Sequence, residues 1–241
     1  MSLLEAKNLT KSFGGLLAVN DLSFGVEAGE TVGLLGPNGA GKTTVFALVS
    51  GFYPPTRGSV TFDGRNLRGL RPDQICQLGL TRTFQLVQPF PHLTALENVM
   101  VGAFVRHPSR REAEDKAVEV LRLVGMGDKA NTLAQSLSVP ERKRLELAKA
   151  LATEPKMVLL DEVMAGLRLA EIEQAVALIK TLRTWGITFL IIEHVMRAVM
   201  ALADRVVVMH HGEKIAEGEP AEVARNEKVI EAYLGEDALL A

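Results

Sequence analysis

The sequence is poor in cysteine and in aromatic residues: among 241 residues it has one cysteine, one tryptophan and two tyrosines. The lone Cys76 excludes an internal disulfide, so the chain suits a reducing compartment, and we expect Cys76 to be a buried small side chain. No run reaches the roughly 18 consecutive apolar residues of a membrane span, and the N-terminal stretch lacks the pattern of a secretory signal. Work at a membrane would therefore need a partner that holds the chain there.

An excess of charge of one sign is also missing. The formal net charge is -2, which gives no reason to expect a nucleic-acid surface, and we predict no nucleic-acid partner. Hydrophobic residues make up 47% of the chain, which is ample for a buried core. The length allows one large domain or a core with a subdomain.

Short apolar runs are present, and each is followed by a plausible helix. They are TVGLLG at 31–36, KMVLLDE at 156–162 and ITFLIIEH at 187–194. Continuous apolar strands that alternate with helices predict a parallel sheet covered on both faces. Half-buried antiparallel strands are predicted beside it, at 3–13, 17–26 and 58–64.

Two further segments complete the predicted fold. Between about 86 and 155 the strand signals stop and apolar residues recur at helical spacing, which predicts an all-helical insert. Residues 205–220 read as a hairpin that turns at His211-Gly212, followed by a short helical tail. The predicted fold class is therefore α/β, with a mixed sheet, an antiparallel β part and a helical insert.

Residues 36–43, GPNGAGKT, match the pattern G-x-x-x-x-G-K-[ST] between an apolar strand and a helical stretch. Its glycines let successive N–H groups face inward, and the following helix N-terminus adds positive potential, which suits the β- and γ-phosphates of a nucleotide. Lys42 would add a charge and Thr43 a Mg²⁺ ligand. The predicted phosphate-binding residues are Gly36, Pro37, Asn38, Gly39, Ala40, Gly41, Lys42, Thr43 and Thr44.

Acidic residues and a histidine stand where two other apolar strands end. Asp161 is placed to reach a Mg²⁺ ion, and Glu162 follows it one residue nearer to an attacking water. His194 ends the next apolar strand and could contact a γ-phosphate, because parallel sheets gather such strand ends beside the ligand. The alternative is that these are solvated charges at strand ends, although a carboxylate pair there is otherwise expensive to bury.

In this order the motifs resemble those of the nucleotide-binding subunits of ATP-binding cassette (ABC) transporters, over essentially the whole chain. The resemblance adds Phe13, whose ring would stack on the base of ATP for roughly 1–3 kcal/mol. It adds Gln85 in TRTFQ, which would reach the Mg²⁺ and the water. It implies that Glu162, His194, Gln85 and Lys42 are catalytic, and that Thr43, Gln85 and Asp161 hold Mg²⁺, partly through water.

The same resemblance implies a division of the chain. Residues 1–241 would form one nucleotide-binding domain, whose P-loop NTPase core with its antiparallel β subdomain comprises 1–85 and 156–241. Residues 86–155 would form a helical subdomain that carries the family signature and docks on a transmembrane partner. ATP and Mg²⁺ are the cofactors that this assignment implies.

Within the family, FGGLLAVNDLSF, RTFQ, IIEHVM and AYLGE look most like the branched-chain amino-acid importers. Such systems place two different ATPase subunits at the cytoplasmic face of the membrane, under two transmembrane permease subunits fed by an extracytoplasmic binding protein. Lipopolysaccharide-export ATPases are similar and form a neighbouring candidate. A nucleotide-gated clamp with little turnover and a soluble ABC protein of DNA repair or translation are rival functions.

The expected signature, Leu-Ser-Gly-Gly-Gln, reads Leu-Ser-Val-Pro-Glu at 137–141. In the family this segment caps the γ-phosphate bound to the opposite subunit, so Ser138 would act in trans. Pro140 has no N–H, and a hydrogen bond to a charged group is worth about 1.5–3 kcal/mol. Arg168 and Leu169 are a second departure at the same interface. We therefore predict a weakened composite site and favour a heterodimer, with a homodimer as the alternative.

The signature also opens a helix of unusual charge. Ser138 and Glu141 fit a capping box, yet Arg142, Lys143 and Arg144 follow where the helix dipole is positive. Such a placement costs about 0.3–1 kcal/mol per charge unless an anion stands in front of the helix. The sequence suggests the partner's γ-phosphate as that anion. Alternatively, Ser138, the dipole and these cations together offset the missing glycines.

Overall fold

The structure, a computed structural model, describes residues 2–85 and 87–237. Its central sheet has six strands in the order β10-β9-β3-β8-β7-β6, and all pairs are parallel except that of β9 and β10. The strands are β3 Thr31–Leu35, β6 Leu80–Arg82, β7 Met157–Asp161, β8 Thr188–Ile192, β9 Arg205–His210 and β10 Glu213–Gly218. All residues of β3, β7 and β8 are buried, as continuous apolar runs predict.

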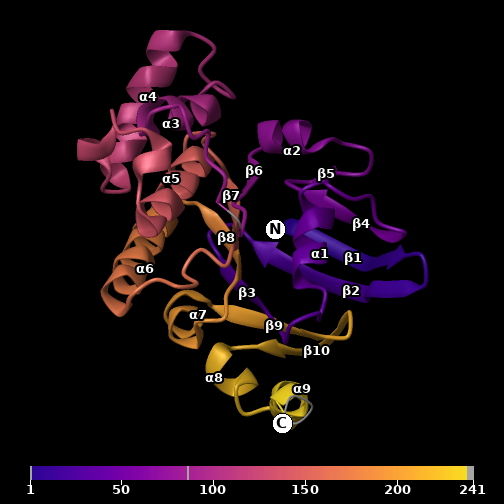
Figure 1. The fold of residues 1–241 in the computed structure, drawn as a ribbon. Helices are drawn as coiled ribbons and strands as arrows, with labels where there is room; N and C mark the ends of the chain where they lie inside the picture. Colours follow the sequence, from indigo (N-terminus) through magenta and orange to yellow (C-terminus); the bar gives the residue numbers. More distant parts are fainter. Residues whose placement is uncertain (1, 86, 238–241) are drawn as a thin grey trace.

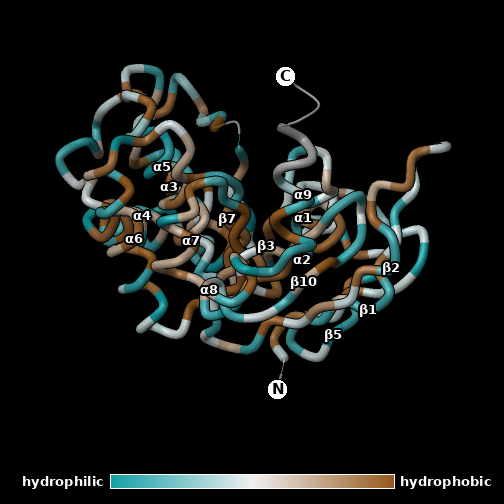
Figure 2. Tube along the Cα trace, turned by 90° about the horizontal axis from the view of Figure 1, so that it is seen from below, coloured by the Kyte–Doolittle hydropathy of each residue, from teal (hydrophilic) through white to brown (hydrophobic). Residues whose placement is uncertain are grey.

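The parallel strands position the site. β3, β7 and β8 are neighbours, so their carboxyl ends at Leu35, Asp161 and Ile192 lie along one edge of the sheet. Figure 2 shows that the most hydrophobic stretches of the chain lie in its centre, along β3 and β7. The residues that follow these strands are therefore brought together on a rigid, buried base.

A second sheet is antiparallel, in the order β2-β1-β4-β5. Its strands are β1 Ser2–Phe13, β2 Leu16–Glu27, β4 Arg57–Phe62 and β5 Arg65–Asn66. Helix α1, Lys42–Val49, packs into the core between the two sheets (Figure 1). The mixed sheet and the antiparallel sheet confirm the predicted fold class.

The described residues between β6 and β7 form helices and 3₁₀ turns joined by loops. These helices lie on the side of the central sheet that faces away from the antiparallel sheet (Figure 1). The helices are α3 Ala95–Ala103, α4 Arg110–Leu123 and α5 Val139–Leu151. Thr94 and Ser109 cap α3 and α4, since each hydroxyl accepts the N–H of a glutamate three residues on. The boundary of this segment as a subdomain stays a prediction.

Strands β9 and β10 form the predicted hairpin. His211 and Gly212 have φ angles of 47° and 84°, the left-handed pair that a two-residue turn needs. The remaining helices are α2 Pro72–Leu78, α6 Leu169–Thr184, α7 Met196–Leu202, α8 Pro220–Val223 and α9 Glu227–Asp237. No helix in the described ranges is long and apolar enough to cross a bilayer.

One expectation about the core is wrong. Cys76, predicted to be a buried small side chain, is only half-buried on α2, where its Sγ lies 3.6 Å from the hydroxyl of Thr81. The sequence does not predict the helix α2, so it does not predict the side of the chain that Cys76 occupies either. The pattern around it is too short to define an apolar face.

Candidate functional site

Two glycines fix the shape of the loop between β3 and α1. A Cβ atom on Gly36 would lie 2.1 Å from the carbonyl oxygen of Met209, and one on Gly41 would lie 2.3 Å from that of Ala18. Their φ angles, 144° and 103°, also belong to the region that favours glycine. Gly41 is the N-cap of α1 and no side chain caps this helix, which leaves its first N–H groups open to an anion.

Lys42 is folded back over this loop. Its ammonium donates to the carbonyl oxygens of Gly36 at 2.6 Å and Pro37 at 2.7 Å, and the side chain is buried. The backbone N–H of Gly36 donates to the hydroxyl of Tyr233 at 2.9 Å, so the C-terminal helix α9 also contacts the loop. This loop of residues 36–43, which we call the P-loop, is thus held by its own lysine and by a residue almost 200 positions away.

Asp161 ends β7 as a buried carboxylate, 1% exposed, and its Oδ2 accepts from Nη2 of Arg82 at 2.7 Å. Its Oδ1 has no hydrogen-bond partner among the described residues. Burial raises the pKa of Asp161, and the guanidinium of Arg82 opposes that rise. A buried carboxylate oxygen without a partner fits a hard cation such as Mg²⁺. Asp161, Thr43, Arg82 and Gln85 line one cavity of about 490 Å³.

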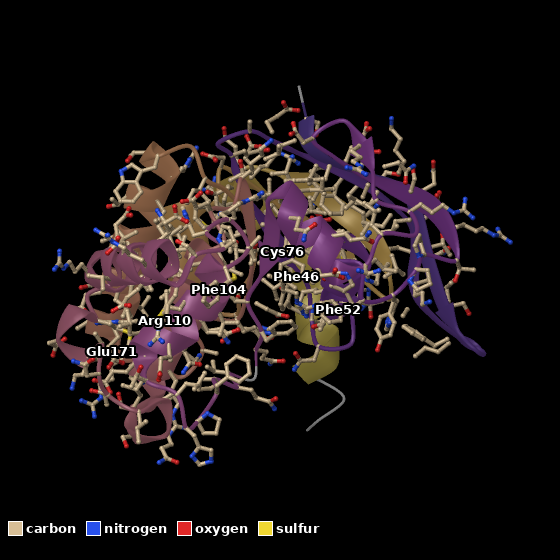
Figure 3. All side chains as sticks on the ribbon, turned by 90° about the horizontal axis from the view of Figure 1, so that it is seen from above. Phe46, Phe52, Cys76, Phe104, Arg110 and Glu171 are labelled. Atoms are coloured by element: carbon tan, nitrogen blue, oxygen red, sulfur yellow. The ribbon has the colours of Figure 1, made fainter. Side chains whose placement is uncertain are left out.

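Arg82 was not singled out from the sequence. It ends a short edge strand that has no apolar pattern of its own, and its partner lies 79 positions away. Its guanidinium also lies 5.6 Å from the ring centre of Phe46 on α1. Figure 3 shows Phe46 near the middle of the molecule, apart from Phe104 and Arg110 on the helical side.

Replacing Arg82 by methionine should leave Asp161 buried without the guanidinium that pairs with it. Removal of one member of a buried ion pair lowers the free energy of unfolding by about 3–5 kcal/mol. Because burial already raises the pKa of Asp161, the loss should shrink as the pH falls and Asp161 becomes neutral. Urea unfolding at pH 7 and pH 5, with the exposed Arg65→Met as control, measures this. Equal losses in both variants would contradict it.

Glu162 is held at both carboxylate oxygens. Its Oε1 lies 2.9 Å from Nε2 of His194, and its Oε2 accepts from Nε2 of Gln85 at 2.6 Å. The backbone of Glu162 has a φ of 51°, a strained conformation for a residue with a side chain, at about 1–3 kcal/mol. Three residues that the sequence singled out are therefore in direct contact.

Phe13 and Ser138 lie apart from this cluster. Phe13 closes β1, is 40% exposed, and meets the ring of Tyr53 edge-on with the ring centres 5.3 Å apart. Ser138 is the N-cap of α5, where its N–H and its hydroxyl both donate to Oε2 of Glu141 at 2.8 Å. Glu141 also pairs with Lys129 at 3.2 Å. These contacts lower the pKa of Glu141, the backbone N–H of Ser138 most of all.

The structure gives the three cations of α5 partners within the chain. Arg142 donates to the carbonyl oxygens of Leu137 and Gln135 at 2.8 and 3.0 Å. Lys143 donates to backbone carbonyls after β7, and Arg144 to the side-chain oxygen of Gln174. The charges are therefore accommodated without an anion in front of the helix, and the suggestion that a phosphate must explain them is not needed.

Comparison with known proteins identifies the family of this chain. The family model "ABC transporter" matches residues 19–165, and "Branched-chain amino acid ATP-binding cassette transporter" matches residues 213–238. Among curated relatives, the high-affinity branched-chain amino acid transport ATP-binding proteins BraF of Pseudomonas aeruginosa and LivG of Salmonella typhimurium are 41% and 42% identical. Each alignment covers 97% of this chain and 98% of the relative. The lipopolysaccharide export system ATP-binding protein LptB of Escherichia coli is 37% identical, with 98% and 99% covered.

Solved structures give the same result. An ATP-binding cassette of an ABC transporter in its ADP conformation has a TM-score of 0.89 at 32% identity, and the match covers 98% of this chain and 99% of that one. A dimeric cassette bound to ADP and Pi has a TM-score of 0.82 at 27% identity, with 90% and 98% covered. The chain therefore belongs to the ABC transporter family and is one of its ATPase cassettes.

Proposed function

We propose that this chain binds Mg-ATP, closes on a second ATPase subunit and hydrolyses the ATP to drive import of branched-chain amino acids. The observation that carries the proposal is the pair of contacts that Gln85 and His194 make with the Glu162 carboxylate, next to Asp161. A carboxylate held at the end of a buried strand has the position of a general base.

The phosphates of ATP would lie on the backbone N–H groups of the P-loop, with the ammonium of Lys42 against the β- and γ-phosphates. Phe13, half-exposed at the end of β1, is the candidate for stacking on the base. Thr43, Asp161 and Gln85 would hold Mg²⁺, partly through water. The assignment is supported by Oδ1 of Asp161, a buried oxygen without a hydrogen-bond partner among the described residues. The bound ion would neutralise charge that develops on the transferred phosphoryl group.

Hydrolysis needs a water molecule in line with the γ-phosphate. The oxygen of that water forms a bond to the γ-phosphorus while the bond from this phosphorus to the β-phosphate oxygen breaks. The proton of that water passes to the Glu162 carboxylate. Gln85 and His194 each contact one oxygen of this carboxylate, and each oxygen keeps a second lone pair that can accept the proton.

The cargo is proposed from the relatives. The curated relatives at 40–42% identity act in branched-chain amino acid transport, and a model of such cassettes matches residues 213–238. The chain would bind two transmembrane permease subunits at the cytoplasmic face of the membrane, with an extracytoplasmic binding protein reached through them. Lipopolysaccharide export is the second candidate, because one export ATPase is 37% identical.

Co-purification tests this choice. We expect the chain to assemble with the permease pair of a branched-chain amino-acid importer, and the assembly to raise its ATPase rate when the leucine-loaded binding protein is added. Assembly with lipopolysaccharide-export membrane subunits, and stimulation by lipopolysaccharide instead, would favour the second candidate. Failure to assemble with either set of membrane subunits would contradict a transport role.

The second ATPase subunit is proposed to differ from this chain. Val139 is 62% exposed at the start of α5, and Pro140 and Glu141 follow it where the family has glycine and glutamine. Glu141 is committed to Ser138 and Lys129, so Ser138 must leave its own cap to face a partner's phosphate. A homodimer would repeat this weakness in both composite sites.

Restoring glycine at both positions 139 and 140 should strengthen that composite site. Glycine at position 140 returns one N–H, and a hydrogen bond to a charged group is worth about 1.5–3 kcal/mol, or roughly 10- to 100-fold in ATP affinity. Equilibrium ATP binding to the heterodimer measures the gain. The gain should vanish when the partner subunit's own P-loop lysine is replaced. An unchanged affinity would favour the alternative that the variant signature costs little.

A further inference from the structure

Two charged side chains outside the proposed nucleotide contacts hold the loop that follows β7. Glu193, directly after β8, is 3% exposed. Lys143 is half-buried in the second turn of α5, the helix that opens with the signature. Both side chains bond to the backbone of residues 162–165, which we call the post-β7 loop. These two residues approach the same loop from different elements.

Lys143 bonds to carbonyl groups of the post-β7 loop. Its Nζ donates to the carbonyl oxygen of Glu162 at 3.3 Å and to that of Ala165. The N–H of Glu162 donates to the carbonyl oxygen of Ile192 at 2.9 Å, so the peptide groups on both sides of this residue are fixed. The position of α5 therefore bears directly on the backbone of the proposed general base.

Glu193 holds the same loop by accepting a hydrogen bond from one of its backbone N–H groups. Its Oε1 accepts the N–H of Met164 at 2.7 Å, while its Oε2 has no hydrogen-bond partner in the described part of the chain. Burial raises the pKa of Glu193, and Lys143 opposes that rise. Burial likewise lowers the pKa of Lys143, and the carboxylates of Glu193 and Glu162 oppose the fall. Each charged group thus stabilises the charged form of the other.

We infer that Lys143 and Glu193 clamp the post-β7 loop, position Glu162 for hydrolysis and tie it to the signature helix. This inference rests on the proposed function, in which α5 meets the nucleotide of the partner subunit while Glu162 serves the chain's own nucleotide. A single lysine side chain then connects the helix that engages one ATP to the residue that hydrolyses the other. Lys143 and Glu193 are positioning residues, since their bonds go to the backbone of the loop.

The first test replaces Lys143 by methionine, which removes the ammonium and keeps the stem. Lys180→Met, at an exposed position on α6, is the matched control. In the nucleotide-free chain, we expect amide hydrogen exchange of residues 163–165 to become at least ten-fold faster in Lys143→Met and to stay unchanged in the control. Lys143→Arg, which can still donate to both carbonyls, should restore slow exchange.

The second readout is steady-state ATP hydrolysis by the ATPase pair. Lys143→Met should lower kcat at least ten-fold and leave KM for ATP within two-fold, because the phosphate contacts are intact. Glu193→Gln keeps an acceptor for Met164 but loses the charge. In the double variant Lys143→Met/Glu193→Gln, the fold-loss in kcat should be much smaller than the product of the fold-losses of the two single variants. A loss in kcat of the double variant equal to the product of the two single losses would overturn a shared clamp.

The outcomes separate this inference from the proposed function. If Glu162→Gln hydrolyses ATP normally in the same assay, the role of Glu162 fails, whatever Lys143 does. If Glu162→Gln is inactive while Lys143→Met matches the control in exchange and in kcat, the clamp alone is overturned. Thermal melting shows whether each variant folds, and if Lys143→Met does not, Lys143→Arg and Glu193→Gln give the same comparison.

Discussion

Glu162→Gln should still bind ATP and should hydrolyse it about 10²–10⁴ times more slowly, the range that a positioned general base contributes. Glutamine has nearly the same shape, and its side-chain oxygen can still accept one bond from Gln85 or His194. It cannot accept the proton of the attacking water. The steady-state rate of phosphate release and the Kd for ATP, measured on the same preparation, check both halves of this prediction.

Glu173→Gln is the matched control, since Glu173 is exposed on α6 and pairs only with a surface arginine among the described contacts. Its rate should equal that of the parent protein. A Glu162→Gln chain that keeps full turnover would remove Glu162 as the base. A parent protein that binds ATP tightly yet hardly turns it over would instead support the nucleotide-gated clamp.

Lys42→Met should abolish tight ATP binding. Two opposite unit charges 4 Å apart at an effective dielectric constant of 20 attract by about 4 kcal/mol, which corresponds to roughly 10²–10³ in affinity. The variant also loses the hydrogen bonds from Lys42 to the carbonyls of Gly36 and Pro37, so the loop should become less ordered. Isothermal titration with Mg-ATP measures the affinity, and amide exchange of residues 36–41 reports the loop.

Lys180→Met controls for the loss of one positive charge, because Lys180 is exposed on α6. The contrast with Glu162→Gln makes the two predictions independent: one variant should bind without hydrolysis, and the other should fail to bind. Lys42→Met with an affinity within three-fold of the parent would contradict the phosphate contact. Such a result would leave the lysine with only its role inside the loop.

The local features of the site could be predicted from the sequence because they are made by consecutive residues. Gly36 and Gly41 leave no room for a Cβ beside two backbone carbonyls, and that requirement is written in the motif itself. Apolar runs predicted β3, β7 and β8, and parallel strands bring their carboxyl ends together, so the meeting of Glu162 and His194 followed from the fold. The capping box of Ser138 and Glu141 was likewise a local pattern.

Contacts that depend on how distant side chains pack could not be predicted. Arg82 bonds to Asp161, and Tyr233 bonds to Gly36, across long separations in sequence that no spacing rule describes. The cations of α5 were assigned to a phosphate because the sequence shows the charges but not the carbonyl groups that Arg142 and Lys143 reach. Partner choice for long basic side chains depends on tertiary packing, which a helical pattern leaves open.

Sedimentation of Glu162→Gln protein with ATP tests the central claim most directly, namely that this chain is one half of an unequal ATPase pair. We predict little dimer with ATP alone, and a stable ATP-dependent dimer when the ATPase subunit that shares its permease is added. A tight homodimer with ATP alone, together with full cooperative hydrolysis by the parent chain alone, would contradict that claim.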